Sequence, residues 1–309
     1  MDITVIFATA NRAELLAQTL GHLESLNTSG LNWRLIVVDN GSRDSTPDVL
    51  AAARTRLPLL ALSQPEPGKN RALNMGLPHI TGELTVFTDD DIVPARDWLQ
   101  ALAAAARRWP AHDVFAGRIT PRYPAETPEW VRQHPFSGAA FVHFELPQDE
   151  GPIENLALGP NFAVRQAVAA RHRFSEAIGP RTGQGNYAMG SETEYLLRLK
   201  RAGHKTVYVP SAHVEHVVHA TQATPEWMLG RSFRLGRGLT RLGLVNPLKK
   251  PHPFGVPLAM FPMIGRTWLR YRLSPLLGWH RHFDVALEYQ FLRGSLHELR
   301  LIAQEAGAR

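Results

Sequence analysis

Residues 84–91 read LTVFTDDD, a short apolar run that ends in three adjacent carboxylates. The run predicts a buried strand, Leu84–Phe87. Three neighbouring carboxylates repel one another unless a cation neutralises them, and oxygen ligands of this kind suit Mn²⁺ or Mg²⁺. The alternative interpretation is a solvated loop in which Asp91 caps a helix. A position at the end of a buried strand favours the cation site.

Three further apolar runs precede this strand and alternate with helix-length amphipathic segments. The predicted strands are Ile3–Phe7, Leu35–Val38 and Leu59–Leu62, and the predicted helices are residues 13–26, a segment that opens at residues 45–47, and residues 70–77. Continuous apolar strands separated by helices require a parallel sheet covered on both faces, and right-handed crossovers make it doubly wound. Ligands of such sheets bind beyond the carboxyl ends of the strands.

Polar side chains gather at those predicted carboxyl ends. They are Thr9, Asn11 and Arg12 after the first strand, Asp39 and Asn40 after the second, and Asp89, Asp90 and Asp91 after the fourth. No glycine-rich dinucleotide loop follows the first strand, and the sequence has no Gly-Lys-Ser/Thr phosphate loop. The pattern therefore argues against a dinucleotide dehydrogenase and against a P-loop NTPase.

The composition sets broad limits on the protein. Its 309 residues include no cysteine, which removes disulfides and thiolate chemistry and fits a reducing compartment. Residues 1–4 begin a strand-like run without a basic stretch, so no secretory signal is predicted and the cytoplasm is the expected location. The net charge of +6 is uneven, because residues 225–309 carry 13 Lys and Arg against 5 Asp and Glu. This tail predicts an anionic partner, either phospholipid headgroups or nucleic acid.

Six stretches of the chain, taken together, carry a family resemblance. Residues 4–12, 37–42, 68–76 and 87–92 resemble the nucleotide-sugar half of the family 2 glycosyltransferases, and residues 159–165 and 190–194 resemble the acceptor-side motifs of that family. The resemblance covers about residues 2–220 and implies an α/β fold with a doubly wound, mostly parallel sheet of GT-A type. It implies a catalytic domain over residues 1–224, divided into a nucleotide-sugar half (1–118) and an acceptor half (119–224). A basic helical extension, residues 225–309, follows.

The resemblance also implies roles for single residues. At the donor side, Thr9 and Asp39 would hold the nucleobase, Asn11, Arg12 and Asn40 would line the nucleotide-sugar site, and Arg71 would lie near the base or the diphosphate. Asp89 and Asp90 would serve the ribose and the metal, and Asp90 or Asp91 would ligate the metal directly. At the acceptor side, Asn161 and Phe162 would bind the acceptor, and Glu192 would be the catalytic base.

The sequence departs from the family pattern at two places. Thr88 stands where the family often has the first aspartate of its acidic motif, which leaves open which carboxylate ligates the ion. Where the family usually reads Gly-Glu-Asp, this chain has Gly190, Ser191 and Glu192, so a glutamate replaces the usual aspartate base. The competing interpretation of this segment is a capping box, in which Ser191 and Glu194 close the first turn of a helix.

Three histidines follow a further predicted strand, Val207–Pro210, at spacings of three: His213, His216 and His219. His216 falls where many GT-A enzymes place a histidine beside the metal, and a neutral imidazole can complete an oxygen-rich coordination sphere. The alternative is an interfacial histidine with a satisfied hydrogen bond.

The predicted reaction is an inverting sugar transfer from a nucleotide diphosphate to an acceptor hydroxyl, in polysaccharide or glycoconjugate synthesis. A divalent ion would stabilise the charge that develops on the diphosphate, and a carboxylate on the opposite face of the sugar would take the acceptor's proton. Asp39 can pair with an N–H of uracil or guanine, and a UDP-sugar is the preferred prediction. The alternatives are a retaining glycosyltransferase or a nucleotidyltransferase on a similar fold, or a non-catalytic protein that binds an anionic surface or a nucleic acid.

The basic tail leaves two interpretations open. Arg231, Arg234, Arg237 and Arg241 fall on one face of a helix predicted over residues 227–242, and Trp268, Tyr271 and Trp279 lie among arginines in a pattern typical of a membrane interface. Residues 254–265 are uncharged but too few to span a bilayer. A peripheral position on the inner face of the cell membrane is one prediction, and packing of these helices on the catalytic body is the other. No nucleic-acid partner is expected, because stacking motifs for single strands are absent.

Overall fold

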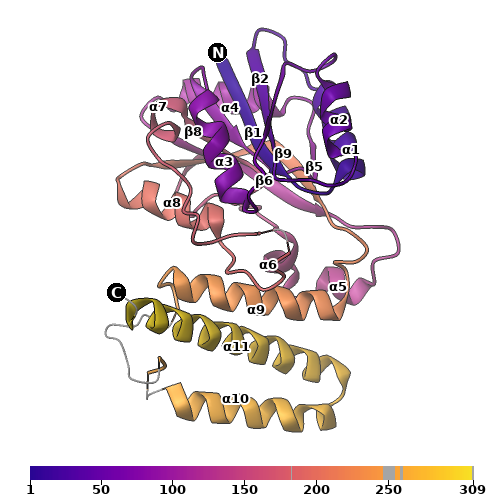
Figure 1. The fold of residues 1–309 in the computed structure, drawn as a ribbon, viewed down its shortest axis with the longest axis vertical. Helices are drawn as coiled ribbons and strands as arrows, with labels where there is room; N and C mark the ends of the chain where they lie inside the picture. Colours follow the sequence, from indigo (N-terminus) through magenta and orange to yellow (C-terminus); the bar gives the residue numbers. More distant parts are fainter. Residues whose placement is uncertain (182, 246–254, 258–259, 308–309) are drawn as a thin grey trace. The chain divides into compact units, whose positions relative to one another are not determined.

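A sheet of nine strands organises residues 1–218 in the described part of the chain, which covers residues 1–181, 183–245, 255–257 and 260–307 of a computed structural model (Figure 1). The described residues divide into two compact units. The first contains residues 1–125, 133–177 and 191–218, and the second contains residues 126–132, 178–190 and 219–309. The catalytic and C-terminal domains expected at 1–224 and 225–309 stay predictions.

The strand order is β3-β2-β1-β4-β8-β6-β9-β5, with β7 paired to β9. The strands are β1 (Asp2–Thr9), β2 (Asn32–Asp39), β3 (Leu59–Ser63), β4 (Leu84–Phe87), β5 (Ile92–Pro94), β6 (Val114–Arg122), β7 (Gly151–Ile153), β8 (Phe162–Arg165) and β9 (Thr206–Val217). β3, β2, β1 and β4 pair in parallel, as do β6 and β9, whereas β8, β5 and β7 run antiparallel to their neighbours. The prediction of an α/β fold with a mostly parallel sheet is confirmed.

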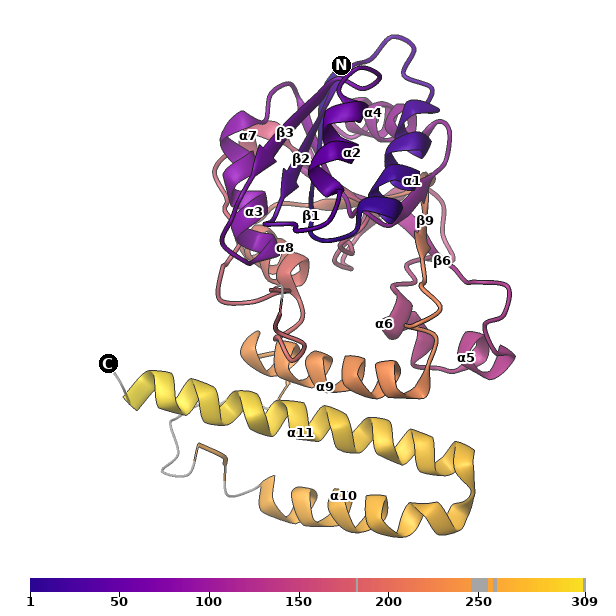
Figure 2. The ribbon, with the colours of Figure 1, turned by 45° about the vertical axis from the view of Figure 1, so that its right-hand side comes forward.

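Helices cover this sheet on both faces. Those of the first unit are α1 (Ala13–Glu24), α2 (Thr46–Ala53), α3 (Lys69–Gly76) with the 3₁₀ turn η1 (Leu77–His79), α4 (Trp98–Arg108), α6 (Ser137–Phe141), α7 (Gln166–Ala169) and α8 (Ser191–Arg201). Figure 2 shows α1 and α2 on one side of the parallel strands and α3 on the other. Gly76 lets α3 approach closely, because a Cβ there would come 2.6 Å from Cδ1 of Ile6.

The parallel strands β1 to β4 form where the apolar runs predicted them; β4 has the predicted bounds, and the other three extend by up to three residues at an end. Val5, Ile6 and Phe7 of β1 are buried, and so are Leu35 to Val38 of β2. Side chains on both faces of these strands are buried, which is what parallel pairing under two layers of helices requires. This core carries the carboxyl ends of β1, β2 and β4 to one edge of the sheet.

A bulge interrupts the pairing of β6 with β9. Gly117 pairs with Val209, but the next residue, Arg118, pairs with His213. The Asn161 side chain fills the space beside Gly117, where a Cβ would overlap it, and its Nδ2 donates hydrogen bonds to the carbonyls of Ala212 (2.7 Å) and Arg118 (2.9 Å). Asn161 therefore satisfies backbone carbonyls around the bulge.

The described residues of the second unit form three long helices, α9 (Pro225–Arg241), α10 (Phe261–Leu273) and α11 (Trp279–Gly307), with a 3₁₀ turn η3 (Ser274–Leu277) between the last two. All but the last residue of the short α5 (Glu129–Gln133) also belong to this unit. α11 lies between α9 and α10 (Figures 1 and 2). Glycines let α9 and α11 approach closely. A Cβ at Gly236 would overlap the backbone of Phe291, and a Cβ at Gly294 would overlap the backbone of Phe233. The predicted helical extension is confirmed.

Two of the four arginines predicted on the cationic face of α9 are held by carboxylates of α11. Arg237 and Arg241 both form ion pairs with Glu298 of α11, a side chain with no exposed surface, and Arg241 also pairs with Glu305. A guanidinium held by a buried carboxylate is not available to an outside partner. No helix among the described residues is both long and apolar enough to cross a membrane. Part of the uncharged segment 254–265 lies outside the described residues.

Candidate active site

Residues 89–91 lie between β4 and β5 at the carboxyl edge of the sheet. Thr9 and Asp39, the last residues of β1 and β2, are paired in the ladder, and Phe87 of β4 is paired with Ile6 of β1. The three aspartates therefore follow a strand that lies directly beside β1. This is the edge where ligands bind in doubly wound sheets.

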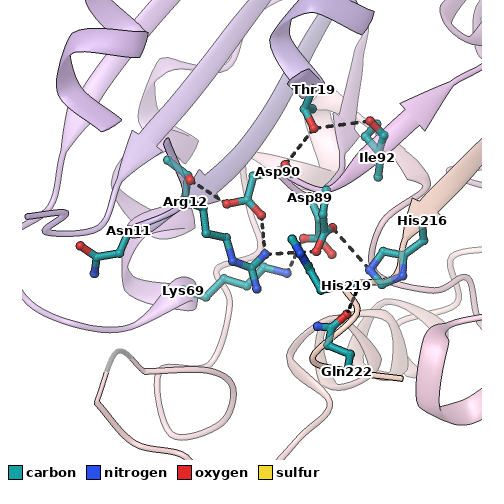
Figure 3. A network of polar contacts seen from close by, with 12 residues as sticks. Asn11, Arg12, Thr19, Lys69, Asp89, Asp90, Ile92, His216, His219 and Gln222 are labelled. Atoms are coloured by element: carbon teal, nitrogen blue, oxygen red, sulfur yellow. Dashed lines mark hydrogen bonds and ion pairs between the residues drawn. The ribbon is translucent and has the colours of Figure 1, made fainter. Parts of the chain in front are cut away.

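Asp90 points toward β1 and α1. It accepts hydrogen bonds from Oγ1 of Thr9 (2.6 Å) and from the Arg12 guanidinium (2.8 Å), and its backbone carbonyl accepts one from Thr19 of α1 (2.8 Å) (Figure 3). The pKa of Arg12 is raised, chiefly by the charge of Asp90. Thr9 and Arg12, both predicted at the nucleotide site, are thus brought together around Asp90.

Asp89 and Glu192 share one cation, the ammonium of Lys69. Nζ of Lys69 lies 2.6 Å from Oδ1 of Asp89 and 2.6 Å from Oε1 of Glu192, and the three side chains are each about one-fifth exposed. Burial alone would lower the pKa of Lys69, but the two carboxylates raise it well above its usual range. The candidate base of α8 and the acidic triplet therefore meet at a single side chain from the first turn of α3.

Asp89, Asp91 and His216 form a group whose candidate ligand atoms all lie within 4.8 Å of one another. Nε2 of His216 is 3.4 Å from Oδ1 of Asp91, and this buried oxygen accepts no hydrogen bond from the described residues. The main-chain N–H of Val217 donates to the carbonyl of Asp91 (2.8 Å), which fixes β9 against the triplet. Two carboxylates and an imidazole are a donor set that fits Mn²⁺ or Mg²⁺.

The carboxylate of Asp90 lies outside this group, because its two oxygens are engaged by Thr9 and Arg12, whereas Asp89 lies within the group with Asp91 and His216. The direct ligation of a metal by Asp90 stays a prediction. Asp91 caps no helix, because β5 begins at the next residue and α4 begins at Trp98 with Asp97 before it.

Burial and charge act differently on the three carboxyl groups. Burial raises the pKa of Asp89 and of Asp90. Burial also acts to raise the pKa of Asp91, but His216 and Arg12 outweigh it, so the pKa of Asp91 lies well below its usual range. Burial therefore disfavours the ionised forms of Asp89 and Asp90, even though Lys69 and Arg12 lie beside them.

The segment before the triplet is fixed by the first acceptor-side motif. The Thr88 hydroxyl donates to the carbonyl of Pro160 (2.7 Å), a bond that an ionised aspartate could not form. Gly159 lies against Glu192, where an added Cβ would be 3.1 Å from Cδ of that side chain. The motif therefore positions both the triplet and the candidate base.

Asn161 and Phe162 have structural roles in this part of the sheet. Both side chains have no exposed surface. Oδ1 of Asn161 accepts a hydrogen bond from Nε1 of Trp98 (2.9 Å), and the ring of Phe162 stacks on Phe87 at 4.9 Å between centroids. These two side chains support the strand that carries the triplet, and their contact with the acceptor stays a prediction.

Asp39, Asn11 and Asn40 shape the nucleotide edge of the sheet. Oδ1 of Asp39 accepts from the N–H of Ser42 (3.0 Å), and the Ser42 hydroxyl accepts from the N–H of Asn11, which has a φ of 53°. Asn40 is buried and braces the loop before α3, since its Oδ1 accepts from the N–H of Gly68 (2.7 Å) and its amide donates to the carbonyls of Gln64 and Glu66. Asn40 therefore shapes this edge of the site through the loop.

Arg71 lies on α3 between two carboxylates, Glu176 at 2.9 Å and Glu66. It is farther along α3 than Lys69, the cation that contacts the triplet. Lys69 was not predicted as a site residue, although it lies within the matching stretch 68–76. Its only signal in the sequence is a lysine beside Asn70 near the start of a predicted helix, and sequence spacing alone does not connect it to Glu192.

The capping box predicted for Ser191 and Glu194 is wrong. The buried Oγ of Ser191 has no hydrogen-bond partner among the described residues, and Glu194 forms an ion pair with Arg198 one turn later (2.6 Å). Of the three histidines after β9 begins, His213 bonds to the Thr120 hydroxyl (2.8 Å), and His216 faces Asp91. The structure therefore separates a structural histidine from a candidate ligand.

Comparison with known proteins gives the same family as the motifs. The family model "Glycosyl transferase family 2" matches residues 4–173. Glycosyltransferase AglE of Haloferax volcanii is 23% identical over 266 residues, 85% of this chain and 80% of that protein.

Two solved structures show the same fold. Mannosyltransferase PcManGT from Pyrobaculum calidifontis, solved with GDP-Man and Mn²⁺, gives a TM-score of 0.56 at 22% identity, over 99% of this chain and 79% of that one. Residues 1–349 of S. aureus TarS, solved with UDP-GlcNAc, give a TM-score of 0.54 at 16% identity, over 100% of this chain and 92% of that one. The likeness confirms the predicted GT-A fold.

Proposed function

Because the chain belongs to glycosyltransferase family 2, we propose that it moves a sugar from UDP to an acceptor hydroxyl with inversion of the anomeric carbon. That it is a glycosyltransferase with a nucleotide-sugar donor rests on the family and on the relatives above. The inverting course, the nucleotide, the metal and the acceptor are the proposed parts. The observation that carries them is the Lys69 ammonium held between Asp89 and Glu192.

Glu192 is the proposed base. In an inverting transfer the acceptor hydroxyl attacks the face of the sugar opposite the leaving diphosphate, and a carboxylate there takes its proton. Glu192 lies in the first turn of α8, across Lys69 from the carboxylates that would hold the diphosphate end. The acceptor oxygen forms the new bond as the sugar-phosphate bond breaks, its proton passes to Glu192, and the nucleoside diphosphate leaves.

Asp89, Asp91 and His216 are the residues that would hold a divalent ion. Bound there, such an ion supplies positive charge that stabilises the leaving diphosphate. Arg12 and Lys69 add two fixed cations on the protein's side of the site, and both stay protonated beside their carboxylate partners. The developing phosphate charge would thus meet a preorganised positive environment.

The proposed donor is a UDP-sugar. Asp39 ends β2 at this edge of the sheet, and its carboxylate can accept the imide N–H of uracil. The solved relatives include one with GDP-Man and one with UDP-GlcNAc, so the nucleotide has to be tested directly.

The proposed acceptor is a saccharide or lipid-linked hydroxyl in polysaccharide or glycoconjugate synthesis, and the proposed location is the cytoplasm. The absence of cysteine fits a reducing compartment. A screen of acceptors with the preferred donor would identify the class.

Thermal melting with nucleotides and Mn²⁺ tests the donor and the metal together. A ligand at 100 times its Kd stabilises the native state by about 2.7 kcal/mol, so UDP-sugars with Mn²⁺ should raise the melting temperature by several degrees and GDP-sugars should not. Because the pKa of Asp89 is raised, protons compete with the ion at higher pH than for an ordinary aspartate, and the Mn²⁺ effect should shrink on acidification.

Turnover gives the second readout. Excess EDTA should abolish sugar transfer and Mn²⁺ should restore it, whereas full activity in EDTA would remove the metal from the mechanism. Retention of the donor's anomeric configuration in the product would indicate a retaining enzyme, and release of pyrophosphate would indicate a nucleotidyltransferase. Asp91→Asn should weaken the Mn²⁺ response, with Asp97→Asn, at the start of α4, as the matched control.

A further inference from the structure

The outer side of helix α10 concentrates apolar side chains that a folded protein normally buries. Nine large apolar side chains are exposed in the described residues, and eight of them lie between residues 261 and 279. Leu276 is 83% exposed, and Phe261, Trp268, Leu269 and Leu273 are each about half exposed. A contiguous set of this kind marks an interaction surface rather than chance exposure.

The opposite side of α10 is held by α11. Ile264 packs with Met260 against Leu292, and the ring of Tyr271 stacks on Tyr289 at 4.4 Å between centroids. The partly buried residues Ile264, Thr267 and Tyr271 recur at spacings of three and four, so they share one side of the helix. One side of α10 is therefore packed against α11, and the other side is exposed to solvent.

The presented side is positively charged. Residues 255–283 contain four arginines and no aspartate or glutamate. Arg266 and Arg272 are exposed among the apolar side chains, and the guanidinium of Arg272 lies 5.8 Å from the centre of the Trp268 ring. Arg270 differs, because it pairs with Glu288 of α11 (2.8 Å).

The α10 face consists of Phe261, Arg266, Trp268, Leu269, Arg272 and Leu273. We propose that the α10 face docks on an anionic lipid bilayer. An amphipathic helix lies in the membrane interface when its apolar side chains enter the acyl boundary while its arginines meet lipid phosphates. Trp268 beside Arg272 has the chemistry of the headgroup level.

Two other occupants fit the α10 face less well. A nucleic acid would account for the arginines but not for the exposed leucines. A second copy of the chain, docked by the same face, would bring arginines against arginines. An anionic bilayer satisfies both chemistries at once, and this binding does not depend on the reaction proposed above.

Vesicle flotation with the full chain tests the proposal. The protein should float with vesicles of phosphatidylcholine mixed with phosphatidylglycerol, and it should float much less with pure phosphatidylcholine or at high salt. Arg266→Gln combined with Arg272→Gln should weaken binding roughly 25-fold, since each arginine near an anionic surface contributes about fivefold. Leu269→Ser combined with Leu273→Ser should weaken it by at least about tenfold, since each side chain loses its contact with the acyl boundary.

Two controls separate the α10 face from general charge and from misfolding. Arg107→Gln combined with Arg201→Gln removes the same charge from exposed positions of α4 and α8 and should bind as the wild type. Arg270→Gln should have a smaller effect than either arginine of the face, because Glu288 already pairs with it. The altered side chains are exposed, so melting temperatures should stay within a few degrees of the wild type.

Three results would overturn the proposal: equal binding to neutral and anionic vesicles, wild-type binding by the face variants, or no binding by the intact chain. Sedimentation velocity provides the remaining comparison. If the intact chain is a dimer that the leucine variant converts to monomer, and it ignores vesicles, the α10 face is an interface between copies instead.

Discussion

Replacing Glu192 by Gln separates its proposed catalytic role from its role in holding Lys69. The amide keeps the size of the side chain and still offers an oxygen to the Lys69 ammonium, now 2.6 Å from the carboxylate. A hydrogen bond to a charged group contributes about 1.5–3 kcal/mol and one involving a neutral group about half as much, so the substitution should cost about 1 kcal/mol of stability. It removes any group able to take the acceptor's proton.

Turnover should therefore fall far more than stability. General-base catalysis contributes about 10²–10⁴-fold, which corresponds to about 3–5 kcal/mol of activation free energy. The assay is single-turnover release of the nucleoside diphosphate at saturating Mn²⁺ and donor, with thermal melting in parallel. Donor KM should change little, because Glu192 is proposed to act on the acceptor.

Glu194→Gln is the matched control, since Glu194 lies two residues from Glu192 in the same first turn of α8. Glu194 pairs with Arg198 at i,i+4, and such pairs contribute about 0.3–0.5 kcal/mol, so the control should melt slightly lower and turn over normally. If Glu192→Gln keeps more than about a tenth of the wild-type rate while chemistry is limiting, the assignment of the base is wrong.

Two more predictions follow from side chains that the structure places in new roles. Lys69→Met leaves Asp89 and Glu192 without their shared cation, so the metal-free protein should lose about 3–5 kcal/mol of stability. Mn²⁺ should stabilise this variant more than it stabilises the wild type, and Lys205→Met at an exposed position is the control. Asn161→Leu strands the Nε1 of Trp98 and the carbonyls of Ala212 and Arg118, so urea unfolding should show a loss of about 2–4 kcal/mol with acceptor KM unchanged; a large rise in KM at normal stability would support the acceptor contact predicted for Asn161.

The sequence was sufficient to predict the parallel half of the sheet, because its strands are short runs buried on both faces and its helices begin and end at clear signals. β4, predicted over Leu84–Phe87, has those bounds in the structure. It was not sufficient for β8, Phe162–Arg165, which pairs antiparallel with both β4 and β6. Three apolar residues followed by Arg165 carry no sign of strand direction.

The site was predicted in outline for a similar reason. Carboxyl ends of parallel strands bring their polar residues to one edge, so Thr9, Arg12 and the triplet were expected together. Which oxygen of the triplet faces which neighbour depends on side-chain partners from distant segments. Lys69 and Asn161 show this, since their contacts with Glu192 and with the β6–β9 bulge join residues that no local pattern connects.

The number of residues in the bulge between β6 and β9 determines which histidine of β9 becomes the candidate metal ligand. In an uninterrupted ladder, the pairing of Gly117 with Val209 would place His213 opposite Pro121, the place that His216 occupies. Because the detour adds an odd number of residues, it also turns the other set of β9 side chains toward that side of the sheet. Because three residues separate His213 from His216, removal of the three extra residues of the bulge would bring His213 to the position of His216. In a relative whose bulge has more or fewer residues, another histidine of β9 would lie beside the carboxylates. A sequence alignment would then not pair that histidine with His216.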